Sequence, residues 1–296
     1  MTAPLSGAVY DRSYRPYEGD RGGRRASVLA LYRSTIRRAL GIRRSWRQKV
    51  LPWTLLAIAT VPAVVNVGVG YLTRDTPAED FEFITYREYV GVSSALLMFV
   101  AVTAPDVLCP DRRNRVLPLI FSRPLTGTDY ALAKLAAITT LVFGFAFLPQ
   151  VVLFVGQMLV SDGALDYLVD NAEVIWQVAA SAAVLSVFYA AGGLALASLT
   201  TRRVVGGVAF LAALLISSSV AGILTSAEPG RPSAWLVLNL AGLPLILRDL
   251  VFLGHVDRFS ELSGVEGGGA LAVAVYLVVL ATSVGILVWR YRWVEA

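Results

Sequence analysis

The residues of this sequence that are best suited to chemistry lie in a polar stretch, 110–130, between two apolar runs long enough to cross a bilayer. The stretch reads PDRRNRVLPLIFSRPLTGTDY and combines an acidic–basic pair, an apolar patch, a proline-containing turn and an acidic–aromatic pair. Catalysis needs paired acid and base groups, an activated nucleophile or metal ligands, and this stretch has no such constellation. Its side chains are better suited to docking a soluble protein.

The rest of the chain adds no catalytic or metal-binding motif. The sequence has no G-x-x-x-x-G-K-[ST] loop for ATP phosphates, no G-x-S-x-G nucleophile motif and no H-E-x-x-H metal motif. Its single cysteine, Cys109, excludes an intramolecular disulfide, and its single histidine, His255, has no Cys/His cluster with which to bind a metal. We therefore expect no catalytic residues, no metal site and no cofactor in this chain itself.

The composition is typical of a membrane protein built from helices. Apolar residues make up 56% of the 296 residues and charged residues only 16%, and the mean hydropathy is +0.64. The apolar residues are concentrated in runs of the length that a helix needs to cross about 30 Å of hydrocarbon. Residues 51–296 are thus predicted to form an all-α polytopic domain, with six transmembrane helices at 51–72, 89–109, 131–160, 174–199, 204–225 and 270–289.

The distribution of charge orients these helices. Residues 1–50, the 110–134 segment, the 200–203 turn and the C-terminal tail hold 21 of the 26 lysines and arginines. Two thirds of the acidic residues lie in the other three loops. Because basic residues are retained on the cytoplasmic side, we expect both chain termini in the cytoplasm. Arginine far outnumbers lysine in a chain rich in Ala, Gly and Val, which is typical of a GC-rich bacterial genome, and we therefore expect the spans to lie in a bacterial cytoplasmic membrane.

Residues 226–269 are predicted to form an external loop. Their apolar part, 234–256, is interrupted by Asn239, Pro244 and Arg248. A seventh span at this position would also place the C-terminal arginines outside the cell, against the distribution of charge. We therefore expect the apolar part of the loop to lie in, or dip into, the outer leaflet.

Two segments precede the first span. Residues 1–23 form a cytoplasmic arm rich in Tyr, Arg, Pro and Gly, compatible both with disorder and with a protein-binding segment. Residues 24–50 have apolar side chains at helical spacing and arginines over much of the rest. This pattern predicts an amphipathic interfacial helix, with a bend at Gly41, that contacts anionic lipid. Its position directly before the first span favours the membrane over nucleic acid as the partner of this charge.

The sequence of residues 110–134 resembles that of the membrane subunits of type 2 ABC exporters. Their usual pattern after the second span is an acidic–basic pair, a small-Thr-Leu step, an apolar run, a proline turn and a Gly-Lys or Ala-Lys pair. Here DR at 111–112, SRPLT at 122–126 and AK at 133–134 match this pattern, whereas NRVL at 114–117 replaces the small-Thr-Leu step. The order of a basic helix, six spans and a long external loop before the last span also matches.

The resemblance implies a permease subunit, not an enzyme, that forms a pathway for a hydrophobic or amphiphilic substrate. It implies two copies of a separate ABC ATPase, which would bind ATP and Mg, and a second permease copy, either identical or homologous. In this family the segment after span two is a cytoplasmic coupling element that docks in a groove of the ATPase. The contact residues that the resemblance implies are Asp111, Arg112, Arg113, Arg123, Pro124, Leu125, Thr126, Asp129 and Tyr130.

Polar residues inside the predicted spans are few, among them Asn66, Gln150, Gln157 and Gln177. A mostly apolar lumen suits a hydrophobic or amphiphilic cargo. Related exporters line their transport path with spans two and five. The candidate path residues are therefore Ser94, Met98, Thr103, Ser217 and Ser218.

Two other functions remain open. An ion-coupled secondary transporter would normally have buried carboxylates or broken helices in paired halves, and neither is evident in the sequence. A membrane scaffold would recruit a cytoplasmic partner through the Tyr/Arg-rich arm. An ATPase encoded beside this chain would favour the exporter over both alternatives.

Overall fold

The computed structural model describes residues 22–42, 46–74, 84–89, 94–227, 233–258 and 260–292, and every regular element within these ranges is a helix. The elements are α1 (Arg24–Ala39), α2 (Trp46–Thr73), α3 (Tyr86–Tyr89), α4 (Ser94–Arg113), α5 (Leu117–Phe121), α6 (Gly127–Val160), α7 (Ala164–Asp170), α8 (Ala172–Ser198), α9 (Arg203–Ser226), η1 (Ala234–Leu238), α10 (Leu243–Leu253), η2 (Glu261–Gly264) and α11 (Gly268–Arg292). Six of these helices (α2, α4, α6, α8, α9 and α11) are long and apolar enough to cross a membrane. The chain is a polytopic helical membrane protein, and the predicted all-α fold with six spans is confirmed.

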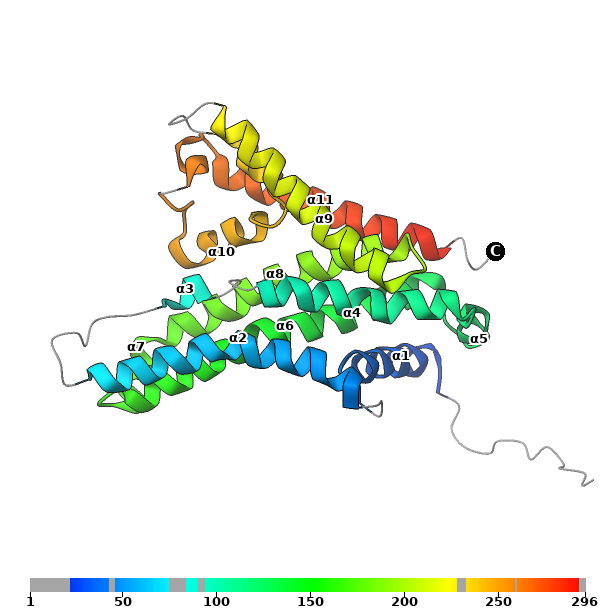
Figure 1. Ribbon diagram of the computed structural model, residues 1–296, viewed down its shortest axis with the longest axis horizontal. Coiled ribbons are helices and arrows are strands. Elements are labelled where there is room, and N and C mark those ends of the chain that lie inside the picture. Colours follow the sequence, from blue (N-terminus) through cyan, green and yellow to red (C-terminus); the bar gives the residue numbers. More distant parts are fainter. Residues whose placement is uncertain are drawn as a thin grey trace, which may run out of the picture.

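The helices α4 and α8 form the centre of the bundle. A larger share of their residues is buried than in any other span of the described chain. α8 packs against α4, α6, α9 and α11, while α6 also packs against α1 and α2. Figure 1 shows α2 along one edge of the molecule and α9 and α11 along the opposite edge. Only 17% of the apolar stretch of α2 and of α11 is buried within the single chain, as expected for helices that face lipid or a partner.

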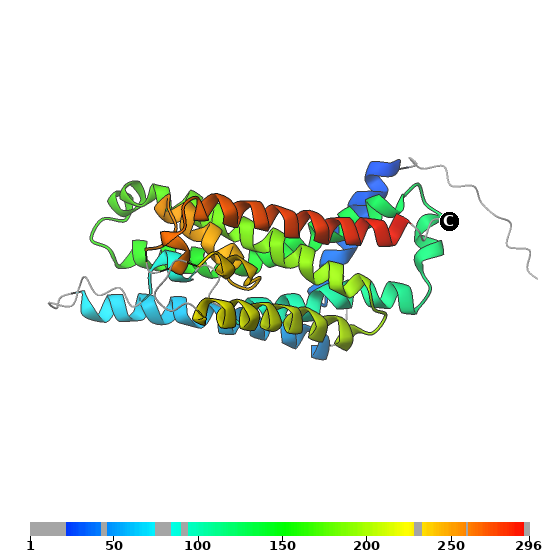
Figure 2. The same cartoon turned by 90° about the horizontal axis from the view of Figure 1, so that it is seen from above.

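The two ends of the bundle differ in charge. Figures 1 and 2 show α1, α5 and the last turns of α11 at one end, and α3, α7 and α10 toward the other. We call the first the basic end, because it carries Arg112, Arg113, Arg115, Arg123, Arg202, Arg203, Arg290 and Arg292. We call the second the acidic end, because it carries Asp162, Asp166, Asp170, Glu173, Asp249, Asp257 and Glu266.

The single amphipathic helix predicted over 24–50 is divided in the structure. α1 ends at Ala39, and Gly41 in the turn that follows has a left-handed backbone with φ of 68°. Glycine adopts this conformation without the steric penalty of a Cβ atom, and it therefore ends the helix. Residues 46–50 belong instead to α2 and continue into the first span. α1 packs against α6, where the Tyr32 hydroxyl donates to Thr140 Oγ1 over 3.0 Å.

The start of α6 is fixed by a capping box. The Thr126 hydroxyl accepts a hydrogen bond from the Asp129 N–H over 3.2 Å, and the Asp129 carboxylate accepts one from the Thr126 N–H over 3.1 Å. Two backbone donors of the first turn, which have no partner inside a helix, are satisfied in this way. Pro124, two residues earlier, is compatible with the non-helical backbone before the cap.

Glycines allow the central helices to approach one another closely. A Cβ atom on Gly193 of α8 would lie only 2.7 Å from Val100 Cγ1 of α4. A Cβ atom on Gly207 of α9 would collide with the backbone carbonyl oxygen of Ala101 in α4. Small residues at helix contacts are typical of membrane bundles because they bring backbones into van der Waals contact.

We predict that Gly207→Val destabilises the bundle by about 1–3 kcal/mol, because a side chain placed against an immobile backbone forces α9 away from α4. Gly222 is the matched control, since it lies on the same helix and has open space where its Cβ would be. The thermal unfolding midpoint in detergent, measured for both valine variants, checks this prediction. Equal midpoints for the two variants would contradict the close contact at Gly207.

The 226–269 segment forms short helices that pack on the bundle. α10 has 11 residues, too few to cross a membrane. It packs against α8 and α11, and the Tyr189 hydroxyl of α8 donates to the Ala241 carbonyl oxygen over 2.8 Å. The Arg248 side chain, buried on α10, pairs with Asp249 over 2.7 Å. Within the described part of this segment there is no further span, as the sequence predicted.

Candidate functional site

A buried ionic network lies at the basic end, where α4 passes into α5. Its centre is Asp111, in the last turn of α4. One carboxylate oxygen accepts from Lys134 Nζ over 2.9 Å and from the Tyr130 hydroxyl over 2.8 Å, both on α6. The other oxygen accepts from Arg38 Nη1 of α1 over 2.5 Å. A single carboxylate thus connects three helices that are far apart in the sequence.

The members of this network are largely removed from solvent. Asp111, Lys134 and Tyr130 are buried, and Arg38 is partly buried. Lys134 Nζ also donates to the Val107 carbonyl oxygen over 3.3 Å. Burial of ionised groups is unfavourable unless each is paired and hydrogen-bonded. The two cations and the anion therefore depend on one another, and the helices that carry them are held in register.

Tyr130 extends the network to the neighbouring helices. Its ring centroid is 4.9 Å from that of Tyr291 in α11 and 6.0 Å from that of Phe121 in α5. α5 is a short helix of five residues between α4 and α6. Tyr130 contacts both Phe121 and Asp111. Displacement of α5 would therefore shift Tyr130 relative to the Asp111 carboxylate.

Two further interactions brace the basic end. Arg24 of α1 binds both carboxylate oxygens of Asp129, with Nε at 2.7 Å and Nη2 at 2.8 Å. The Asp129 carboxylate raises the pKa of Arg24, chiefly through these hydrogen bonds. Arg112 donates to the carbonyl oxygens of Ser198 and Thr200 at the end of α8, a favourable place for a cation because helix carbonyls are unpaired there.

The remaining predicted contact residues divide into exposed and buried groups. Arg113, Arg123, Pro124 and Thr126 are exposed, whereas Leu125 is buried. The exposed residues flank the outer face of α5, which we call the α5 surface. It is formed by Arg113, Arg115, Pro118, Leu119, Ser122, Arg123 and Pro124.

Three of the predicted docking residues, Asp111, Leu125 and Tyr130, are buried in this conformation. Asp111 and Leu125 nevertheless line the groove between α1 and α5. Asp111 is buried because it is the counter-ion of the buried Lys134. Tyr130 is buried with it because the Tyr130 hydroxyl donates to the Asp111 carboxylate. Leu119 was not predicted from the sequence, yet its side chain is 73% exposed at the centre of the α5 surface.

Sequence reasoning also missed the roles of Arg38 and Lys134. Arg38 was one of many arginines in the amphipathic segment, and nothing in its spacing distinguished it. Lys134 did carry a signal, since it lies four residues after Tyr130 on one helix face within an otherwise apolar run. A lysine in that position needs a buried partner, and Asp111 is that partner.

A groove between α1 and α5 opens beside the network. It encloses about 450 Å³ and exposes Leu31 and Ser34 on one wall and Leu119 and Ile120 on the other. Arg38, Asp111 and Lys134 line it as well. The α5 surface and this groove together form a concave, mainly basic and apolar area, suited to a protein segment with acidic and apolar side chains.

The five candidate path residues lie in different environments. Ser94 and Met98 are exposed on α4, while Thr103 is buried and donates to the Phe99 carbonyl oxygen of its own helix over 2.6 Å. The other two residues, on α9, bind the segment that follows η1. Ser218 donates to Asn239 Oδ1 over 2.6 Å, and Ser217 accepts from the Leu240 N–H over 3.2 Å. Two of the five residues are thus exposed on α4, and the other three form hydrogen bonds within the chain.

No model of a known protein family matches this chain, and no curated protein matches it.

Proposed function

We propose that this chain is the permease subunit of an ATP-driven exporter of the ABC type, which moves a hydrophobic or amphiphilic substrate. In this proposal the chain hydrolyses nothing itself, and two copies of a separate ATPase bind ATP and Mg. A second permease, identical or homologous, completes the pathway, and both termini lie on the cytoplasmic side of a bacterial membrane. The observation that carries the proposal is the α5 surface, placed directly over the buried network.

The geometry supports mechanical coupling in three steps. A partner that docks on the α5 surface would move α5 as a unit, because α5 is short and lies between two helix ends. Phe121 would pass that movement to Tyr130. Asp111 would then pass it to α1, α4 and α6 at once. Tightly packed side chains transmit displacement of this kind because the packed interior is not freely deformable.

An ion-coupled carrier is the second candidate, and the buried Asp111 is the observation that favours it. Buried carboxylates are typical of proton and ion pathways. Asp111, however, is paired with two cations at the end of the bundle, an arrangement that suits a structural role better. Transport that persists after ATP is removed and ceases when the proton gradient is collapsed would favour this second candidate.

The test of the proposal is isolation of the full-length chain from its native membrane in mild detergent, followed by mass spectrometry of the accompanying proteins. We expect a Walker-type ATPase to co-purify with the natural chain and to be lost with Arg123→Glu, because charge reversal on the α5 surface repels the partner. Arg292→Glu is the control, since Arg292 is also exposed at the basic end but belongs to α11 and is not part of the α5 surface. A well-folded preparation without any ATPase would contradict the proposal.

A further inference from the structure

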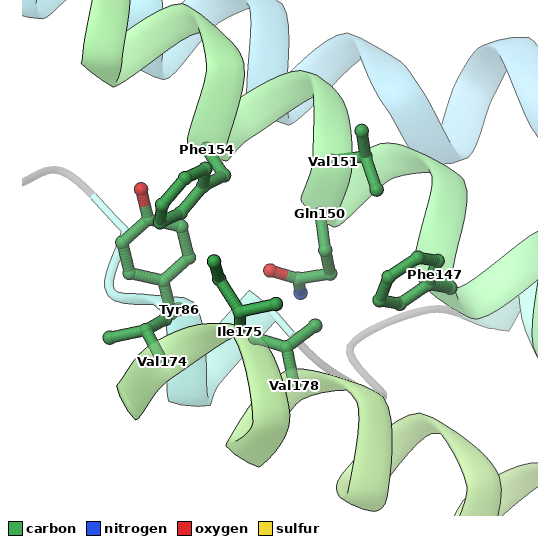
Figure 3. A pocket seen from close by; sticks show the side chains of 8 residues that line it. All are labelled: Tyr86, Phe147, Gln150, Val151, Phe154, Val174, Ile175 and Val178. Atoms are coloured by element: carbon green, nitrogen blue, oxygen red, sulfur yellow. The ribbon is translucent and has the colours of Figure 1, made fainter. Parts of the chain in front are cut away.

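A small cavity of about 180 Å³ lies between α6 and α8, toward the acidic end of the bundle. Its walls are apolar, with Phe147 and Phe154 from α6 and Val174, Ile175 and Val178 from α8 (Figure 3). Ile175 is exposed on the outer surface of α8. The cavity therefore lies beside the flank of the bundle that an apolar molecule in the membrane can reach.

Gln150 of α6 directs its amide into this cavity (Figure 3). The side chain is only 2% exposed, and neither Oε1 nor Nε2 has a hydrogen-bond partner. Among the described residues it is the only buried side chain with two such unpaired polar atoms. Gln177 on the facing helix, by contrast, donates from Nε2 to Glu173 Oε1 over 3.0 Å. An unpaired buried amide is costly, so Gln150 is poised to pair with a ligand.

The chemistry of the amide limits that ligand. A glutamine side chain offers both an acceptor and donors, and a ligand that satisfies both must carry a donor and an acceptor close together. A hydroxyl group or a carboxamide meets this requirement, whereas an ester supplies acceptors only. The apolar walls around Gln150 require the rest of the ligand to be hydrocarbon. A cavity of this size holds roughly a benzene-sized group, so a longer chain would continue outward into lipid.

Aromatic residues mark the level of the cavity along the bundle. The hydroxyl groups of Tyr86 and Tyr167 lie 2.7 Å apart. Both rings flank Phe154, with ring centroids at 6.1 and 5.6 Å from it. Tyrosines are enriched where a membrane meets water, so Gln150 lies just below that level. The polar group of an amphiphile inserted in this leaflet lies at the same depth.

We propose that Gln150 and the surrounding cavity bind a membrane-dissolved amphiphile with one hydroxyl or carboxamide group on a long hydrocarbon chain. The site requires only this chain and no ATPase, so its failure and that of the proposed motor partner are separable. It also lies on α6 and α8, away from the candidate path residues of α4 and α9.

The test uses the full-length chain in nanodiscs of phosphatidylcholine, whose ester linkages offer no donor. Binding of a radiolabelled long-chain primary amide is compared with binding of the methyl ester of the same chain. We expect the natural chain to bind the amide about tenfold more tightly, as a hydrogen bond in an apolar site permits. Gln150→Leu should bind the amide and the ester with about equal affinity, and its affinity for the ester should equal that of the natural chain. Equal binding of the two probes by the natural chain would overturn the proposal.

A second pair of variants keeps the test decisive if Gln150→Leu folds poorly. Ile175→Trp fills the mouth of the cavity from its exposed side and should weaken binding of both probes about tenfold or more. Ile216→Trp on α9 is the matched control, because Ile216 is also an exposed isoleucine but lies away from the cavity, and it should leave binding unchanged. Unaltered binding in Ile175→Trp would show that the amphiphile binds elsewhere, which would overturn the proposal. Absence of binding by the natural chain would also overturn it, because Gln150 would then have only water as a hydrogen-bond partner.

Discussion

Replacement of Asp111 by asparagine is expected to lower the free energy of unfolding by about 3–5 kcal/mol, because it leaves buried cations without their counter-ion. Lys134 would then be buried with only a carbonyl and an amide as partners, and Arg38 would lose its carboxylate. Both α1 and α6 would be loosened from α4. Unfolding in detergent, followed by circular dichroism as denaturant is added, measures this loss.

The double variant Asp111→Asn/Lys134→Met separates loss of charge balance from loss of packing. Methionine keeps the length and apolar stem of lysine but carries no charge, so the double variant should regain at least half of the lost stability. Arg24→Gln is the control for an exposed ion pair, and it should shift the transition little, because solvent screens the Arg24–Asp129 pair. An Asp111→Asn variant as stable as the natural chain would show that the network does not hold the helices together.

Replacement of Leu119 by aspartate is expected to weaken association with the proposed ATPase at least about tenfold, without unfolding the chain. Leu119 is the exposed apolar residue at the centre of the α5 surface, and apolar residues at the centre of an interface commonly carry much of the binding energy. Burial of a new carboxylate in that position would add a desolvation cost. Titration of the purified ATPase against the detergent-solubilised chain, read by a change in fluorescence anisotropy, measures the affinity.

Leu165 provides a matched control for Leu119. It is 78% exposed on α7 at the acidic end, so Leu165→Asp introduces the same charge at the same exposure on the opposite side of the proposed membrane. The affinity of this control for the ATPase should equal that of the natural chain. Equal affinities for the two aspartate variants would remove α5 from the proposed interface.

The spans were predictable because hydropathy is a property of consecutive residues. Each predicted span lies largely within one long helix of the structure. This also holds for the spans that contain glutamine or proline. The cap at Thr126 was predictable for a similar reason, since its partner Asp129 is three residues away. The break after Ala39 was marked by Gly41, but the sequence did not show that residues 46–50 belong to the helix of the first span.

The interior of the candidate site was not predictable from local patterns. Asp111 lies 73 residues from Arg38 and 23 residues from Lys134, and the mutual packing of α1, α4 and α6 brings these groups together. From the sequence alone, Asp111 cannot be distinguished from the other charged residues of the polar stretch 110–130. Gln150 is the comparable case on the other side of the bundle. Its polarity was visible in the sequence, but its unpaired state depends on the walls contributed by α8.

The order in which the network's members appear in the chain bears on biogenesis. Synthesis produces α1 and α4 before α6, so Arg38 and Asp111 emerge from the ribosome before Lys134 does. Lys134 is thus synthesised after the carboxylate with which it pairs, and this pairing lowers the cost of burying its charge at the basic end of α6. A chain that stops before residue 127 would keep Arg38 and Asp111 without Lys134, and the carboxylate would have lost one of its two cations.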